Sequence, residues 1–193
     1  MEKDRVLAFS DGVIAIIITI MVLELRPPHE PTLEALRPLA PTFLAYVLSF
    51  AYVAIYWVNH HHMMHTVERV NGGILWANMV LLFFLSLLPF TTAWMGESEG
   101  GKWPTIVYGL SLLAPAIAYT LLQNVIIGAH GADSTLARAV GADWKGRTSL
   151  LLYIIGIAVA FVQPRWSHAL FVAVALMWLV PDKRIERVMV QER

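Results

Sequence analysis

The sequence contains no cysteine and little charge. Without cysteine, the protein cannot form disulfides, iron–sulfur clusters or thiolate zinc sites. Only 15% of its 193 residues are Asp, Glu, Lys or Arg, and the formal net charge is zero. The clustered Lys and Arg that bind a phosphate backbone are therefore missing, and we expect no nucleic-acid partner.

The sequence also offers no catalytic constellation. Ser10, Ser49, Ser86 and Ser111 lie in or near apolar stretches, without a base and an orienting acid that would complete a triad. No glycine-rich phosphate loop is present either. We predict that the protein is not an enzyme and needs no cofactor.

Apolar residues dominate what remains. They make up 58% of the chain, which is typical of an integral membrane protein. A membrane-spanning helix needs about 20 mostly apolar residues, and the chain contains six such stretches, separated by segments rich in Gly, Pro and charge. We predict an all-α fold, one six-helix transmembrane domain over residues 1–193, with spans near 6–25, 40–64, 73–95, 103–127, 148–164 and 167–181. Only the segment between the fourth and fifth spans is long enough for a short surface helix.

Six spans place both termini on one side of the membrane, and the basic residues indicate which side. Cytoplasmic segments carry an excess of Lys and Arg. Ten basic residues fall on the side of the termini: Lys3, Arg5, Arg69, Arg138, Lys145, Arg147, Lys183, Arg184, Arg187 and Arg193. Four fall on the other side: Arg26, Arg37, Lys102 and Arg165. We predict cytoplasmic termini and a multi-pass protein of the inner (plasma) membrane.

The first span has one continuous apolar face. At about 100° per residue, this face holds Phe9, Gly12, Val13, Ile16, Thr19, Ile20 and Leu23. If several copies of the helix surround an axis, Ile and Leu rings form a hydrophobic constriction, and a threonine ring can contact a partly dehydrated ion. Contact with lipid explains the isoleucines equally well, and the Thr19 hydroxyl can instead bond to a carbonyl one turn earlier.

Asp11 lies off this face, at the start of the same span. A carboxylate inside a bilayer costs several kcal/mol unless it is paired. We expect it to meet a cation or hydrogen-bond donors and so to fix the tilt of the first helix; the candidates are Arg5, the run His60-His61-His62, Arg69 and Asn78. The alternative is a solvated carboxylate at the membrane interface.

Two segments resemble the transmembrane protein 175 family of potassium channels. Arg5, three residues, then Phe9-Ser10-Asp11 resembles the motif that opens the first helix of that family. Residues 56–96 resemble its second and third helices, with matching positions at Tyr56, Trp57, His60, His61, Arg69, Trp76, Asn78, Pro89, Phe90 and Gly96. The chain departs from the family pattern at Asn71, where an acid is expected, and at residues 62–65.

The resemblance implies a potassium-selective cation channel. The bacterial six-helix members assemble as homotetramers whose first helices line the pore, and selectivity comes from side chains. The resemblance places the main constriction at Ile16 and further rings at Thr19, Ile20 and Leu23. It also implies a polar network that holds the pore, formed by Arg5, Phe9, Ser10, Asp11, His60, His61, Arg69 and Asn78. Consistent with side-chain selectivity, the chain lacks a TVGYG-like segment whose carbonyls could replace a hydration shell.

The run HHHMMH, His60 to His65, leaves a second function open. Imidazole and thioether groups suit copper or zinc, and His61 and His65 share one helical face. Two protein ligands make a poor site, so we expect no bound metal and a polar helix end instead. A proton-coupled or metal-ion transporter using this cluster is the alternative function, and a membrane interaction protein without flux is a third.

Overall fold

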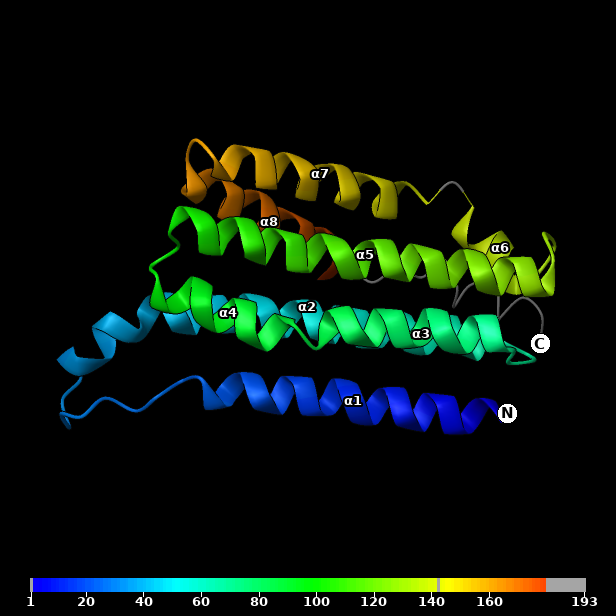
Figure 1. Cartoon of the computed structure of the whole chain (residues 1–193), viewed down its shortest axis with the longest axis horizontal. Coiled ribbons are helices and arrows are strands. Elements are labelled where there is room, and N and C mark those ends of the chain that lie inside the picture. Colours follow the sequence, from blue (N-terminus) through cyan, green and yellow to red (C-terminus); the bar gives the residue numbers. More distant parts are fainter. Residues whose placement is uncertain (1, 142, 180–193) are drawn as a thin grey trace.

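The secondary structure of the described part of the chain is entirely helical. The computed structural model describes residues 2–141 and 143–179 (Figure 1). Its helices are α1 (Lys3–Leu23), the 3-10 helix η1 (Glu34–Leu39), α2 (Ala40–His65), α3 (Gly72–Leu85), α4 (Leu88–Glu97), α5 (Lys102–His130), α6 (Thr135–Val140), α7 (Trp144–Ala160) and α8 (Pro164–Leu179). The predicted all-α class is confirmed. The four basic residues at 183–193 and the end of the sixth predicted span lie outside the described residues.

Four helical stretches of the described residues are long and apolar enough to cross a membrane. They are Lys3–Leu23, Glu34–His65, Gly72–Glu97 and Lys102–His130, and they correspond to the first four predicted spans. Within the described residues, α7 has 17 residues and α8 has 16, both shorter than these four stretches. Six spans therefore remain a prediction.

We expected the third span, residues 73–95, to be one uninterrupted helix, but the structure divides it into α3 and α4. The chain leaves the helix at Ser86 and Leu87 and resumes it in α4. The cause is Pro89, which sits in the first turn of α4 and has no N–H to donate to the carbonyl of Leu85. The Ser86 hydroxyl donates instead to the carbonyl of Phe83 at 2.7 Å, which satisfies part of the broken helix end.

Two loops near the C-terminal half refine the predicted boundaries. The predicted spans 148–164 and 167–181 place the break between them at residues 165–166, which is too late, because only residues 161–163 leave the helix and Pro164 begins α8. Proline is favoured at a first helical position, where a missing N–H costs nothing. The predicted short helix after the fourth span is confirmed as α6, whose cap Ser134 accepts a hydrogen bond from the N–H of Ala137.

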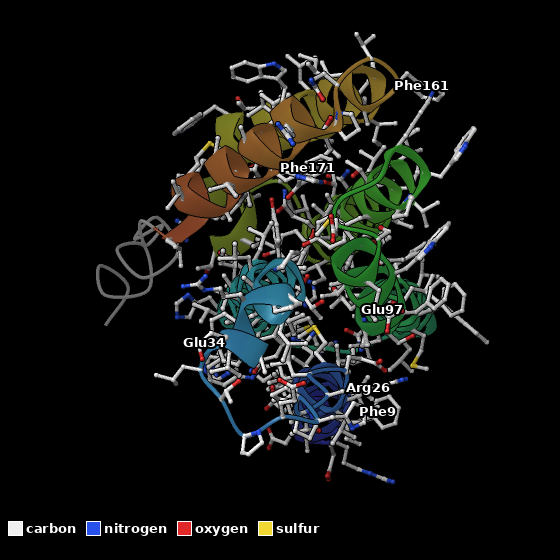
Figure 2. All side chains as sticks on the ribbon, turned by 90° about the vertical axis from the view of Figure 1, so that its left-hand side faces the viewer. Phe9, Arg26, Glu34, Glu97, Phe161 and Phe171 are labelled. Carbon is white, nitrogen blue, oxygen red and sulfur yellow. The ribbon has the colours of Figure 1, made fainter. Side chains whose placement is uncertain are left out.

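The helices form a layered bundle with α1 at one edge. Figure 1 shows α1 beside the layer of α2, α3 and α4, followed by α5 and then by α7 and α8 at the opposite edge. Phe171 of α8 is fully buried where α5, α7 and α8 meet (Figure 2). Its ring needs two glycines: a Cβ on Gly109 would lie 2.8 Å from Phe171 Cζ, and one on Gly156 would lie 2.6 Å from Cε1.

A third close approach, between α2 and α4, gives a stability prediction. A Cβ on Gly96 would lie 2.6 Å from the Cα of Thr42, a backbone atom that cannot rotate away. We expect Gly96→Ala to destabilise the protein by about 1–3 kcal/mol, the usual cost of overpacking, as a lower melting temperature in detergent. Gly128→Ala is the control, because no atom lies within 4 Å of its added methyl group. Equal melting temperatures for the two variants would contradict this packing.

Candidate functional site

Helix α1 packs against the bundle along one face only. Its buried residues recur every three or four positions, as one side of a helix does: Val6, Ser10, Ile14, Ile17 and Met21. They face α2, α3 and α4. Because α1 lies at the edge of the bundle, its other side has no partner within the described part of the chain (Figure 1).

The face predicted to line a pore is this uncovered side. Ile16 is 57% exposed, Ile20 43%, Leu23 75% and Phe9 53%. Figure 2 shows Phe9 pointing away from the bundle. Thr19 is also exposed, and its hydroxyl donates to the carbonyl of Ile16 at 2.9 Å. The back-bond considered from the sequence therefore exists, and it leaves the oxygen lone pairs of Thr19 outside the helix.

On the buried side, a chain of hydrogen bonds joins α1 to α3 and α2. The Asn78 amide nitrogen donates to the Ser10 hydroxyl at 2.9 Å, and its carbonyl oxygen lies 2.7 Å from Nε2 of His60. Because a carbonyl oxygen only accepts, this orientation of the Asn78 amide requires the hydrogen of His60 to be on Nε2. All three residues are at most 1% exposed. The structure thus brings together three members of the predicted network.

Asp11 has a different partner from those we expected. Its carboxylate accepts a hydrogen bond from the indole N–H of Trp57 on α2 at 2.9 Å. The predicted partners were wrong because successive residues of a helix point about 100° apart. Ser10 therefore faces Asn78 on α3, whereas Asp11 faces α2 one turn before His60.

The remaining members of the predicted network stay outside these hydrogen bonds. Arg5, Phe9 and Arg69 are exposed in the described chain. His61 packs edge-on against His65, with ring centroids 4.4 Å apart. Arg69 contributes its backbone N–H, which donates to Nε2 of His130 at 3.3 Å.

The Trp57–Asp11 bond gives a second prediction. Trp57→Phe keeps an aromatic ring but removes the only donor that the described chain supplies to the Asp11 carboxylate. We expect a loss of about 1.5–3 kcal/mol, the value of a hydrogen bond to a charged group, measured by thermal unfolding in detergent. The matched control is Trp76→Phe, because Trp76 is 75% exposed and makes no such bond. If both variants have the same melting temperature, Trp57 does not anchor α1.

A groove of about 750 Å³ runs between α1 and α4. Ile16 and Ile20 form one wall, and Phe90 and Trp94 form the other. Three charged residues line the same groove: Glu24, Arg26 and Glu97. This groove joins the uncovered face of α1 to the side of α4, so both belong to one continuous surface of the single chain.

The histidine run does not gather further metal ligands. Within the described residues, no group of three or more His, Asp or Glu side chains could hold a metal ion. His60 is engaged with Asn78, and His61 and His65 contact each other through their rings. The run divides between the network that anchors α1 and the polar end of α2.

Sequence reasoning missed two polar connections. The hydroxyls of Thr92, Ser49 and Tyr108 form a chain that links α4, α2 and α5, with separations of 2.7 and 2.8 Å. His130, at the end of α5, accepts from the N–H groups of Glu68 and Arg69 and so ties the α2–α3 turn to α5. Small hydroxyl residues between membrane helices are the sequence signal for the first connection; the second has none.

Comparison with known proteins identifies the family of this chain. The model of the family described as "Endosomal/lysosomal potassium channel TMEM175" matches residues 5–89. A potassium channel of Chryseobacterium sp. (strain P1-3) is 52% identical over 97% of both chains. One of Chamaesiphon minutus is 32% identical, covering 84% of this chain and 86% of that protein.

A solved structure resembles this chain in fold as well as in sequence. The crystal structure of a lysosomal potassium-selective channel TMEM175 homologue from Chamaesiphon minutus superposes with a TM-score of 0.78 at 29% identity, covering 94% of this chain and 98% of that one. Fold and relatives together define an all-helical membrane protein of the ion-channel class. The chain belongs to the TMEM175 family of potassium channels.

Proposed function

We propose that the protein is a potassium-selective cation channel in which four chains place their α1 helices around a shared axis. The uncovered face of α1 lines the pore, and Ile16 forms its main constriction. The observation that carries this proposal is that α1 is anchored on one side and bare on the other, in a chain whose bacterial relatives are named potassium channels.

Stacked side-chain rings would provide the selectivity. Ile16 and Ile20 are separated by about 6 Å along the axis, and Leu23 follows one turn later. An ion that passes an apolar ring must lose part of its water. Potassium binds water less strongly than sodium does, so its passage costs less. Thr19 lies between these rings, and its hydroxyl proton is already donated to Ile16, which leaves an oxygen acceptor for a cation.

The charges near the end of α1 support an entrance for cations. Glu24 follows the last helical residue of α1, and Glu97 lines the same groove. Arg26 lies with them and reduces the net negative charge. We assign this end to the outside of the cell, because the positive-inside rule places the termini in the cytoplasm, and we place the protein in the plasma membrane as a multi-pass channel.

The direct test is the reversal potential of the purified protein in a planar bilayer, with potassium on one side and sodium on the other. We expect current that reverses near the potassium equilibrium potential. Current without ion preference would overturn the selectivity. No current, together with liposome flux that requires a proton or metal gradient, would support a transporter that uses the histidine run.

The assembly has a separate test. One chain has a mass of 21.6 kDa. We expect light scattering, corrected for detergent, to give the mass of four chains. A monomer that still conducts potassium would contradict a pore shared between α1 helices.

A further inference from the structure

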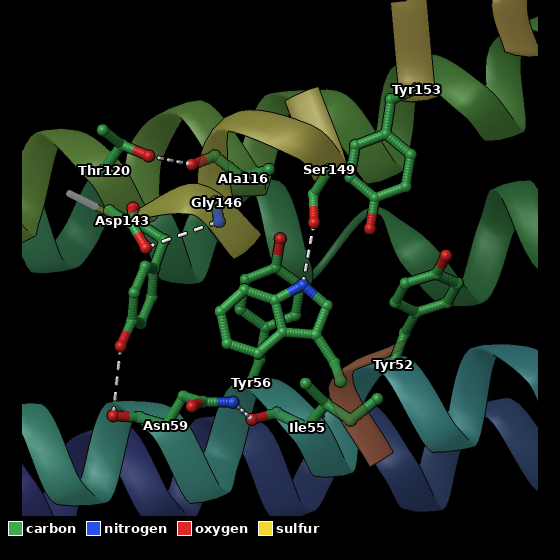
Figure 3. A pocket seen from close by; sticks show the side chains of 12 residues that line it. Tyr52, Ile55, Tyr56, Asn59, Ala116, Thr120, Asp143, Gly146, Ser149 and Tyr153 are labelled. Carbon is green, nitrogen blue, oxygen red and sulfur yellow. Dashed lines mark hydrogen bonds between the residues drawn. The ribbon is translucent and has the colours of Figure 1, made fainter. Parts of the chain in front are cut away.

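A second cavity lies on the side of the bundle away from α1, between α2, α5, α7 and α8 (Figure 3). Its volume is about 50 Å³. One water molecule needs about 10–15 Å³ by this measure, so the cavity has room for three or four small heavy atoms. The site is independent of the pore, because α1 contributes none of its lining.

Five of its twelve lining residues are aromatic: Tyr52, Tyr56, Tyr119, Tyr153 and Trp178. Hydrogen bonds hold several of them in place. The Tyr52 hydroxyl donates to the carbonyl of Phe171 at 2.6 Å, that of Tyr119 donates to the carbonyl of Asn59 at 3.2 Å, and the Trp178 indole donates to Ser149 at 2.8 Å. Fixed aromatic faces carry negative charge density and attract cations.

One wall already contacts an ammonium group. Lys145 lies with its Nζ 5.5 Å from the centre of the Trp178 ring, within the distance of a cation–π contact. Lys145 itself does not line the cavity. The other rings border the space of the cavity, which a ligand can occupy.

Tyr56 also lines the cavity. The residue is only 8% exposed, and its hydroxyl makes no hydrogen bond to any described residue. Nearby, Thr120 donates its proton to the carbonyl of Ala116 at 2.9 Å, so its oxygen remains an acceptor. These two oxygens suit a ligand that donates hydrogen bonds.

A carboxylate also lines the cavity. Asp143 borders both this cavity and a neighbouring one of about 240 Å³ between α5, α6 and α7. It caps α7, accepting from the N–H of Gly146, with its backbone in the left-handed region at φ 39°. Such a conformation is costly for a residue other than glycine and is often found at functional sites. Arg147 lines the neighbouring cavity but not the aromatic one.

We propose that this cavity binds a small organic ammonium ion, a primary alkylammonium of three or four heavy atoms. The ammonium group would donate hydrogen bonds to the carboxylate of Asp143 and the hydroxyl of Tyr56, and the tyrosine rings would cover its alkyl part. The bound ion joins α7 and α8 to α2 and α5. It therefore stabilises the packing of each subunit.

The test is thermal unfolding of the full chain in detergent, titrated with ethylammonium chloride at constant ionic strength. Binding to the native state alone raises the melting temperature in a saturable way. We expect this rise with ethylammonium and none with ethanol, a neutral molecule of the same size. An equal rise with ethanol, with potassium or with sodium would overturn the assignment.

Variants locate the site. Asp143→Asn keeps a capping side chain but removes the charge, and we expect at least tenfold weaker binding. Tyr56→Phe removes one hydroxyl, and we expect about fivefold weaker binding, close to 1 kcal/mol. Asp133→Asn and Tyr46→Phe are the matched controls, since neither residue lines the cavity. Ile16→Asn should keep the full shift, which separates this site from the pore. Unchanged binding in both cavity variants would overturn the proposal.

Discussion

Replacing Ile16 with asparagine is expected to remove most of the preference for potassium over sodium. Ile16 is 57% exposed on the uncovered face of α1, the position where we propose four copies narrow the pore. The amide oxygen can coordinate a cation in place of lost water, so sodium would no longer meet the larger dehydration cost. With potassium on one side of a planar bilayer and sodium on the other, the reversal potential should move most of the way to zero.

The matched control is Val22→Asn. Val22 is also an exposed apolar residue of α1, at 44%, but it points about 120° away from Ile16 around the helix. This control should keep the reversal potential of the unmodified channel. If Ile16→Asn also keeps it, the constriction lies elsewhere, and if both variants lose it, the asparagine disturbs α1 as a whole.

Replacing Asn78 with leucine is expected to cause the largest loss of stability. Leucine has a similar volume but cannot bond, so the Nε2–H of His60 and the hydroxyl of Ser10 both lose their partner in a fully buried site. Each unsatisfied buried group costs about 1–3 kcal/mol, which gives about 2–6 kcal/mol in total. Because the lost bonds tie α1 to the bundle, channel current should fall with the melting temperature.

Asn71→Ala provides the comparison on the same helix. Asn71 caps α3 and accepts a hydrogen bond from the N–H of Ile74 at 2.9 Å, but it is exposed to solvent. Loss of such a cap costs about 1 kcal/mol. We therefore expect a clearly smaller fall in melting temperature than for Asn78→Leu. A similar fall in both variants would show that the buried chain of hydrogen bonds does not anchor α1.

The membrane helices could be predicted because their signal is local. A span is recognised by its length and apolar content, and the helices α1, α2 and α5 lie close to their predicted ranges. The break at Ser86 and Leu87 could not be placed this way, because hydropathy stays high across it. The turn at residues 161–163 was placed too late for a related reason, because the apolar Phe161 and Val162 extend the hydropathy of the fifth span past the end of α7.

The face of α1 was predictable from the period of the helix. Residues that recur every three or four positions share one side, so Ile16, Thr19, Ile20 and Leu23 grouped together before their exposure was known. The same rule placed Asp11 away from them. It could not find the partner of Asp11, because Trp57 is 46 residues distant and the contact depends on how far α1 and α2 are displaced along each other.

The sequence by itself determined the membrane environment, the all-helical class, the family and the grouping of the α1 face, because each depends on residues close together in the chain. The tertiary structure alone decided that Trp57 binds Asp11, that His130 holds the α2–α3 turn, and that tyrosines of three helices enclose one cavity. These features depend on the register and rotation of helices packed side by side. Many side chains set that register together, and no single segment encodes it.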